Sequence, residues 1–530
     1  MKIRPERERR GSTPRYARIA ADIKAVGVAR QLKIFLEKTP CRRGHHWRQE
    51  RSAVPLNHIL KPAVCFAVKR LRCTMPLAAK KVLTKSAWDD LHRDLSARLA
   101  FALTPTLHLQ QTAVNAVARS LPVGHNGRRR HTTHGKVTLL ETIIEFPDLL
   151  ATAAQLISAW IDAQRELFTR LLRDRVDLGS LFPHGRKPFC VTHIRSRLSD
   201  PHDGARTATA IEFIGDCRVI YKPRSSDGEE IWFEALRWLN RNGIHVSFRA
   251  PKMLVRRNYI WMEFLQTKGC KNSTAVRLFY FRWGAQAALA QILGATDLHR
   301  DNWLAIGSQP ILVDAELVGD AERTSPRGKP KSKHRQSLPA ILQTGLLPLL
   351  SRDRAGLYRG IAPLDATISK SAPPKCWPQY RRITQEPSRY VNDLVGGFDA
   401  VAQFFGRPRT AQRFFREVVL RTERQDHRVL LRATAQYARL LRKSCEARNM
   451  ISTGERWRGL VRECCASAPN RRVGYAEARA LLRCDIPKFT KRRNSIPVSW
   501  KIFSAAIGEL KNSSRLLRRR VLLRARVRRA

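Results

Sequence analysis

Between Ile292 and Val318 the sequence reads ILGATDLHRDNWLAIGSQPILVDAELV. Asp297, His299 and Asn302 stand before two short apolar segments that meet at a Gly-Ser turn, and Asp314 and Glu316 follow them. Residues two apart at the end of a strand project to the same side, so the two carboxylates should lie together. Carboxylate and amide oxygens are hard ligands, and the pattern predicts a site for an ion such as Mg²⁺.

The chain carries a large positive charge. Its 530 residues include 99 Lys and Arg against 44 Asp and Glu, a formal charge of +55. Such a charge favours anionic partners and predicts non-specific contact with nucleic acid or anionic surfaces. Because the arginines are spread along the chain, we favour genomic composition over one dedicated binding surface as their origin.

The cysteine pattern and the hydropathy pattern predict a reduced, soluble protein. Eleven cysteines occur without a Cys-x-x-Cys pair, so no zinc is expected. The sequence has no signal peptide and no window of about 18 uninterrupted apolar residues. We therefore expect a bacterial cytoplasmic protein without a transmembrane segment.

Composition divides the chain into segments of different character. Residues 1–84 are basic and interrupted by Pro and Gly, which predicts only short helices there. The helical pattern that starts at Ser86 is expected to break at Pro105. The segment from Phe146 to Arg175 predicts a long amphipathic helix. The segments expected are 1–84, basic; 85–185, helical; 186–320, the core with the polar motifs; 321–510, loops and helices; and 511–530, a basic tail.

The basic tail can be interpreted in two ways. Its leucines and valines could line one side of a basic amphipathic helix, which is a pattern of membrane-surface or partner-binding helices. We favour the simpler interpretation, a solvated and frayed terminus.

The central segment has a recognisable order of elements. It predicts a hairpin turning at Gly215-Asp216, a helix over 228–243, a hairpin turning near Asn258, a helix over 272–294, and then the stretch quoted above. This is the element order of a protein-kinase-like core. We expect an α+β fold with a bilobal core like that of lipid and protein kinases and with extensive helical additions.

The spacing within the quoted stretch assigns the catalytic aspartate. A kinase catalytic loop has an Asp that positions or deprotonates the nucleophile and, five residues later, an Asn for metal, as do Asp297 and Asn302. The string His-Arg-Asp at 299–301 looks like the loop's own signature. Aligning on it would put the metal-binding Asn at Ile306, inside a strand, so we treat this string as a coincidence.

The residues expected to bind the nucleotide are assigned in the same way. Lys222 ends the segment VIYK, the position of the kinase strand lysine that binds ATP phosphates. Glu230 or Glu234 on the next predicted helix is expected to pair with this lysine. Glu263 and Phe264 follow the strand that would lead to the nucleotide hinge.

Several motifs together resemble one known family. Asp200, His202, Gly204 and Arg206 form a D-x-H-x-x-G-R pattern in which the glycine stands one position early, and Tyr221–Arg224 reads YKPR. With A-T-D-L-H-x-x-N and the later D-x-E, these residues resemble the dehydratase domain of class II lanthipeptide synthetases. The likeness runs from about residue 146 to about residue 490.

The resemblance implies a reaction and a set of site residues. Such domains phosphorylate Ser and Thr of a ribosomally made precursor peptide, which carries a leader, with ATP and Mg²⁺. They then eliminate phosphate to leave dehydroalanine or dehydrobutyrine. The implied residues are Asp297 and His299 for catalysis, Asp200 and His202 in a loop over the phosphates with a part in elimination, Lys222, Glu263, Phe264 and Arg206 for the nucleotide, and Asn302, Asp314 and Glu316 for metal.

Two features depart from the family pattern. Further elimination residues are expected between about 345 and 400, where the motifs do not identify them. Family members continue into a zinc-dependent cyclase domain, whereas this chain ends at Ala530. We therefore expect a stand-alone dehydratase or the product of a truncated gene, with a separate cyclase as partner. The alternatives are a peptide kinase that does not eliminate phosphate and a degenerate, non-catalytic basic binding protein.

Overall fold

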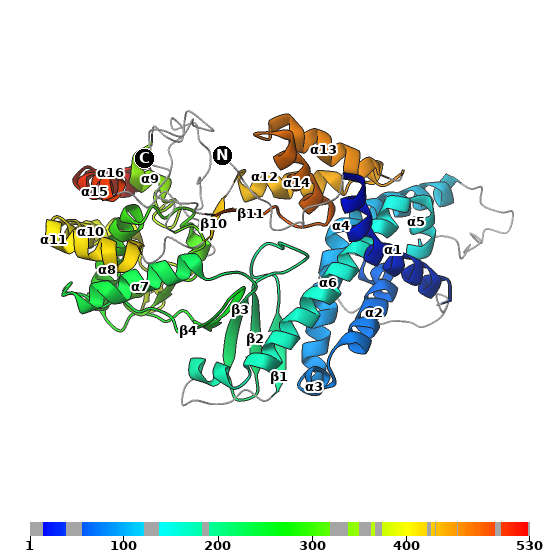
Figure 1. Ribbon diagram of the computed structural model, residues 1–530, viewed down its shortest axis with the longest axis horizontal. Coiled ribbons are helices and arrows are strands. Elements are labelled where there is room, and N and C mark those ends of the chain that lie inside the picture. Colours follow the sequence, from blue (N-terminus) through cyan, green and yellow to red (C-terminus); the bar gives the residue numbers. More distant parts are fainter. Residues whose placement is uncertain are drawn as a thin grey trace.

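The computed structural model places two helical halves on either side of a small antiparallel sheet (Figure 1). One hydrophobic core joins the N-terminal helices to one face of the sheet, and a second core fills the other half. The structure describes residues 14–38, 56–120, 137–182, 190–318, 338–348, 362–365, 374–420, 426–429, 431–452, 454–492 and 500–527.

The first half begins with long helices. Two of those within residues 1–84 are long, since α1 has 25 residues and α2 has 18, whereas α3 has five. The prediction was wrong because α2 buries a continuous apolar stripe, including Leu60, Val64 and Leu71, against its neighbours. The helices of this half are α1 (Pro14–Lys38), α2 (Asn57–Thr74), α3 (Leu77–Lys81), α4 (Lys85–Ser120), α5 (Leu139–Glu145) and α6 (Pro147–Asp174).

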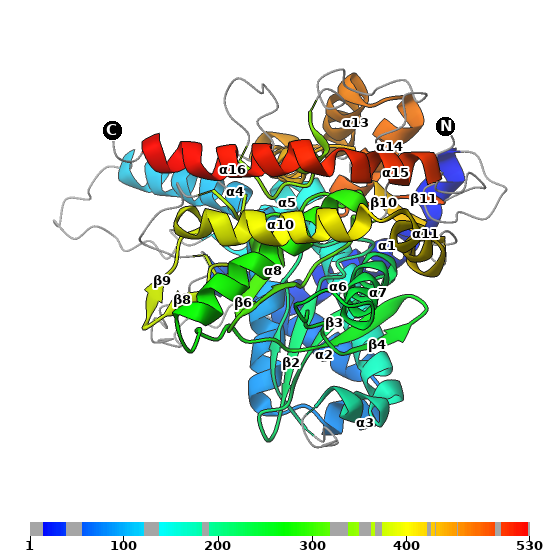
Figure 2. The same cartoon turned by 90° about the vertical axis from the view of Figure 1, so that its left-hand side faces the viewer.

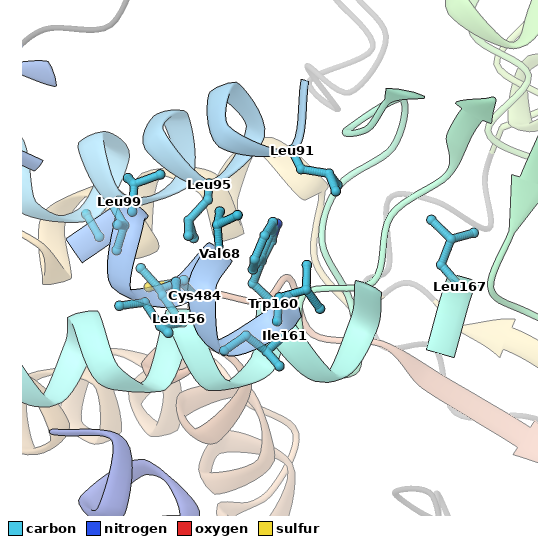
Figure 3. Packing of buried hydrophobic residues seen from close by; sticks show 14 of the residues in the cluster. Val68, Leu91, Leu95, Leu99, Leu156, Trp160, Ile161, Leu167 and Cys484 are labelled. Atoms are coloured by element: carbon cyan, nitrogen blue, oxygen red, sulfur yellow. The ribbon is translucent and has the colours of Figure 1, made fainter. Parts of the chain in front are cut away.

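Helix α4 runs through Pro105, and the break predicted there is absent. Leu103 and Leu107, on either side of the proline, are fully buried, so packing holds the helix where one backbone hydrogen bond is missing. The predicted amphipathic helix is confirmed as α6, with its proline in the first turn. In Figure 3 leucines of α4 face Trp160 of α6 across the first core.

The sheet confirms both predicted hairpins. All of its strand pairs are antiparallel, and its order is β1-β2-β3-β5-β4. Along β5, Trp261 belongs to the first core, whereas Ile260 and Met262 belong to the second, as the alternation of side chains on a strand requires. The strands are β1 (Val191–Arg195), β2 (Thr209–Phe213), β3 (Arg218–Lys222), β4 (Met253–Arg256) and β5 (Tyr259–Glu263).

The second half is built on α7 and α8, both of which the sequence predicted. Helix α7 connects β3 to β4, and α8 precedes the quoted stretch, whose two short strands form the hairpin β6-β7. The elements are α7 (Asp227–Arg241), α8 (Ser273–Ile292), β6 (Trp303–Ile306), β7 (Gln309–Leu312), α9 (Ala340–Gln343), β8 (Gln379–Tyr380), β9 (Ile383–Thr384), α10 (Val391–Phe405), α11 (Pro408–Phe414), α15 (Trp500–Gly508) and α16 (Leu510–Val527).

Helices α8 and α10 approach each other closely through glycines. A Cβ at Gly284 would lie 1.7 Å from the carbonyl oxygen of Leu394, and one at Gly397 would lie 1.7 Å from that of Phe281. Only residues without a side chain allow backbones to pack at this distance. This contact fixes α8, and with it the start of the quoted stretch.

The basic tail is a packed helix over the residues that the structure describes. Helix α16 lies along α10 (Figure 2), and Leu517 and Val521 are fully buried in the second core. The expectation of a frayed terminus was wrong because the leucines and valines between the arginines supply an apolar side that α10 covers.

A third helical unit, α12 (Thr434–Ser444), α13 (Glu455–Ser467) and α14 (Arg471–Leu482), packs on the first core. It is flanked in sequence by β10 (Asp426–Val429) and β11 (Phe489–Arg492), which pair with each other and lie toward the other half in Figure 1. Among the described residues, no helix combines the length and the apolar run needed to cross a membrane.

Candidate active site

Lys222 and Glu229 form the buried base of the site. Lys222, at the end of β3, donates to the Glu229 carboxylate at 3.0 Å and to the Val313 carbonyl at 2.5 Å, and lies 3.6 Å from Asp314. Glu229 is fully buried. The ion pair thus links the sheet and α7 to the strand end that carries the D-x-E motif.

The lysine's partner is therefore neither of the two glutamates that were predicted. Glu230 accepts a hydrogen bond from Ser226, and Glu234 is partly exposed and pairs with Arg237 and Arg241. Successive helical residues are rotated by about 100°, so only Glu229 faces the lysine.

Gly228 sets how closely α7 approaches the motif. A Cβ at this position would lie 1.8 Å from the carbonyl oxygen of Ala315. The glycine thus places the start of α7 directly against the backbone between Asp314 and Glu316.

Arg224, two residues after the lysine, connects three carboxylates. It donates to Glu229 at 2.7 Å and lies 2.5 Å from both Asp314 and Glu316. Burial alone would lower the pKa of Arg224, but these three carboxylates raise it well above its usual value. The guanidinium is a fixed positive charge at the centre of an acidic cluster.

Asp297 lies near enough to this cluster to interact electrostatically with Asp314 and Glu316. It has φ of 63°, a conformation uncommon for a residue other than glycine, and Asn302 donates to its backbone carbonyl at 2.8 Å. Burial raises the pKa of Asp297, and the nearby Asp314 and Glu316 raise it further, against the effect of His299. Such a carboxyl is suited to accept a proton.

The literal His-Arg-Asp string has a different environment. The side chain of Asp301 is 76% exposed, and its backbone N–H donates to the ring of His299, which caps a short turn over Arg300–Asn302. Asp297 rather than Asp301 faces the acidic cluster.

Glu316 is held between two arginines. Its carboxylate pairs with Arg224 on one side and with Arg428 of β10 on the other. Burial would raise the pKa of Glu316, but the two arginines hold it far below its usual range. The carboxylate is therefore ionised throughout the physiological pH range.

The proposed metal ligands differ in how well their positions suit an ion. Asn302 and Asp314 provide amide and carboxylate oxygens, and Asp314 is 34% exposed. Mg²⁺ is commonly held by one or two carboxylates together with substrate phosphates and waters, which this pair fits. Both oxygens of Glu316 are engaged by arginines, and within the described ranges no group of three His, Cys, Asp or Glu side chains is positioned to hold a metal.

His202 reaches the same cluster from the loop between β1 and β2. Its Nδ1 lies 2.7 Å from the carbonyl oxygen of Ile486, so Nδ1 carries the proton, and Nε2 lies 3.2 Å from Arg428. Burial lowers the pKa of His202, and Arg428 lowers it further. The imidazole is thus neutral near pH 7, and Nε2 is its basic nitrogen.

Three of the other predicted site residues, Arg206, Glu263 and Phe264, have partners outside the cluster. Asp200 is exposed, and Arg206 pairs with Glu166 of α6 at 2.6 Å. Glu263 pairs with Arg249 at 3.1 Å, and the Phe264 ring lies 5.3 Å from the Arg218 guanidinium. The predicted segment 345–400 lies partly outside the described residues, at 349–361 and 366–373.

The sequence did not single out three residues of the site. Arg224 belongs to the quoted YKPR string, so its position beside Lys222 was the available signal. Glu229 differs from its neighbours only by its helical phase. Arg428 is 112 residues from Glu316 in sequence and carries no motif that would have identified it.

A protein-family model matches the part of the chain that carries the motifs. The domain of unknown function DUF4135 matches residues 146–373 and 362–492, which is more than half of the chain. The chain belongs to this family. The matched region contains the sheet, the acidic cluster and β10, and it coincides with the range over which the motifs resemble lanthipeptide synthetases.

A curated relative points in the same direction. The chain is 23% identical over 220 residues to the lacticin 481/lactococcin biosynthesis protein LcnDR2 of Lactococcus lactis subsp. lactis. The alignment covers 34% of this chain and 24% of that protein, so the chain spans about a quarter of its relative's length. Together the two matches support a relationship to the lanthipeptide synthetase family.

Proposed function

We propose that this protein is an ATP- and Mg²⁺-dependent dehydratase that phosphorylates Ser and Thr of a precursor peptide and then eliminates phosphate. The observation that carries the proposal is the convergence of Lys222, Asp297, Asn302 and Asp314 on one buried cluster. The similarity to a lacticin 481/lactococcin biosynthesis protein supports a peptide as the substrate.

The order of the elements supports a kinase-like core. An antiparallel sheet with a helix between its third and fourth strands carries the lysine on the third strand and its glutamate partner on that helix. Protein kinases use a Lys-Glu ion pair in the same places, and there it must form before phosphoryl transfer. The hairpin β6-β7 then separates Asn302 from Asp314.

In the phosphorylation step the chain's own residues bind charge and move a proton. Lys222 compensates the negative charge of the nucleotide phosphates. Asp297 accepts the proton of the substrate hydroxyl as its oxygen attacks the γ-phosphorus, and the bond from that phosphorus to ADP breaks so that ADP leaves. Asn302 and Asp314 would hold Mg²⁺, which neutralises charge on the phosphates. Burial makes each of these interactions stronger than in water.

In the elimination step a base removes the α-proton of the phosphorylated residue. The electron pair forms the carbon-carbon double bond as the carbon-oxygen bond breaks and phosphate leaves. Neutral His202 is the proposed base: its Nε2 accepts a hydrogen bond from Arg428, and that bond must open before Nε2 takes the proton. Arg428 beside it supplies positive charge for the departing phosphate.

The test uses intact peptide masses and two variants. The substrate is the Ser- and Thr-containing peptide encoded beside the gene, incubated with Mg-ATP. Asp297→Asn should yield neither product, and His202→Ala should accumulate peptide that is about 80 Da heavier through bound phosphate. Dehydration of the peptide by Asp297→Asn at the wild-type rate would refute the assignment of the first step.

A further inference from the structure

The loop that carries His202 has an unusual backbone. His202 and Arg206 pair with each other through two hydrogen bonds of 3.0 Å. The three residues between them, Asp203, Gly204 and Ala205, all have positive φ, of 49°, 91° and 63°. Left-handed residues are uncommon outside glycine, and consecutive N–H groups in such turns form a concave nest that attracts anions.

The Asp485 carboxylate fills this nest. The Gly204 N–H donates to one of its oxygens at 2.6 Å, and the Ala205 N–H donates to the other at 2.9 Å. Asp485 is 3% exposed and lies 281 residues further along the chain than Gly204. The two N–H groups donate to different oxygens, and in an asparagine one of these two positions would be an NH₂ group, which cannot accept.

The residues after Asp485 hold the rest of the loop. The Ile486 N–H donates to the Pro201 carbonyl at 2.8 Å, and the Ile486 carbonyl accepts from the His202 ring at 2.7 Å. Lys488 lies 3.8 Å from Asp203. The segment 485–488 therefore fixes both the backbone of the loop and the orientation of its imidazole.

The same segment continues into β11 and positions Arg428. Thr490 of β11 is paired with Arg428 of β10. The Arg428 guanidinium in turn contacts both His202 and Glu316. One stretch of chain, directly after α14, thus joins the third helical unit to His202 and Arg428, two of the basic groups at the acidic cluster.

The buried carboxylate of Asp485 costs folding free energy, so a role in packing alone does not account for it. Burial raises the pKa of Asp485 to about 6, although the two N–H donors lower it. Burying a carboxylate costs free energy even when N–H groups donate to it, and a neutral residue at this position would avoid that cost.

We propose that Asp485 is a positioning residue, whose carboxylate anchors the 200–206 loop and, with segment 486–490, holds His202 and Arg428 against the acidic cluster. This proposal rests on the proposed function. Asp485 acts through His202 and Arg428 and does not itself touch the substrate.

The experiment compares Asp485→Asn with wild type in the full-length protein. Amide hydrogen exchange of residues 200–206 should accelerate by about tenfold or more, because one N–H loses its acceptor. Turnover of the peptide should fall on the order of 100-fold, as for a misplaced catalytic group, while the affinity for Mg-ATP stays within about twofold. Asp485→Glu should restore part of the turnover.

Two further variants keep the result interpretable. Asp216→Asn removes an exposed carboxylate at the β2-β3 turn and should change neither exchange nor turnover. Lys488→Met leaves Asp485 in place and should accelerate exchange of the same loop to a smaller extent. It also provides the test if Asp485→Asn does not fold.

The outcomes separate this proposal from the proposed function. Wild-type exchange and turnover in Asp485→Asn would overturn the positioning role, as would lost turnover with unchanged exchange of the loop. If wild-type protein itself shows no ATP-dependent turnover, the proposed function fails and the catalytic part of this inference fails with it. The exchange comparison still decides whether Asp485 anchors the loop.

Discussion

Lys222 pairs with Glu229, whereas the sequence pattern favoured Glu230 or Glu234. Glu229 is buried, and its neighbour Glu230 is partly exposed. The sequence placed Lys222 correctly beside a helix with several acidic residues. It named Glu230 or Glu234 and passed over Glu229, because the rotation of α7 about its axis depends on packing. Residue types and spacing were predictable, whereas the pairing was not.

Replacing Glu229 by Gln tests the buried ion pair. The variant removes the buried carboxylate that pairs with both Lys222 and Arg224, and we expect a loss of about 3 kcal/mol in unfolding free energy together with weaker Mg-ATP binding. Denaturation and calorimetry measure the two effects. The control is Glu234→Gln, on the exposed side of α7, which should change stability by less than about 0.5 kcal/mol. Equal effects of both variants would contradict the pairing.

Asp485 predicts a pH dependence of stability. Its pKa of about 6 in the folded chain exceeds the ordinary 3.8, so the folded state binds this proton more readily. Protonated Asp485 therefore stabilises the folded state by roughly 3 kcal/mol below about pH 3.8. This stabilisation is lost as the pH rises through 6. Asp203 and Cys484 contribute to the shift. The difference in unfolding free energy between wild type and Asp485→Asn should therefore change between pH 4 and 6, and a constant difference would contradict this account.

At the scale of elements, periodicity identified α6, α7, α8 and the three hairpins, because each has a strong pattern and clear turn residues. It failed for α1 and α2, where many arginines and lysines obscure the apolar stripe, and for α16 the apolar side was noticed but a frayed terminus was preferred because the helix that covers this side could not be foreseen. The break predicted in α4 failed for a related reason: tertiary packing on both sides of Pro105 outweighs the local preference.

Gly228 tests the contact between α7 and the D-x-E strand end. Gly228→Ala would place a Cβ within 1.8 Å of the Ala315 carbonyl, so α7 must move away and the Lys222-Glu229 pair must separate from Asp314. We expect ATP-dependent turnover to fall on the order of 100-fold. Gly396→Ala is the matched control, since its nearest neighbour would lie at 3.7 Å. Normal turnover in Gly228→Ala would show that this approach is not required.

Helix α16 predicts a stability effect within the basic tail. Leu517→Ala removes a fully buried side chain from the second core and should lower the unfolding free energy by about 2–5 kcal/mol. Arg519→Ala, on the exposed side of the same helix, should change it by less than about 0.5 kcal/mol. Thermal unfolding of the two variants distinguishes a packed helix from a frayed terminus, for which both values would be small.

At the scale of the whole molecule, the site brings together segments near residues 202, 222, 297, 314 and 428. The sequence supplied the middle three through motif spacing and located His202 through the family resemblance. Arg428 and Asp485 could not be predicted, because a contact between residues more than a hundred positions apart produces no periodic pattern in the sequence. The central sheet and α7 were predictable, but the way in which β10 and β11 bring the third helical unit to the site was not.

The most direct test of the dehydratase account is the ratio of ADP formed to water lost from the peptide. Wild-type protein, Mg-ATP and the neighbouring Ser- and Thr-containing peptide are incubated, ADP is quantified, and the loss of about 18 Da per dehydrated residue is counted from the intact mass. The account predicts one ADP for each water lost and no mass change without ATP. Dehydration without ADP, or ADP formation that leaves the peptide mass unchanged, would contradict it.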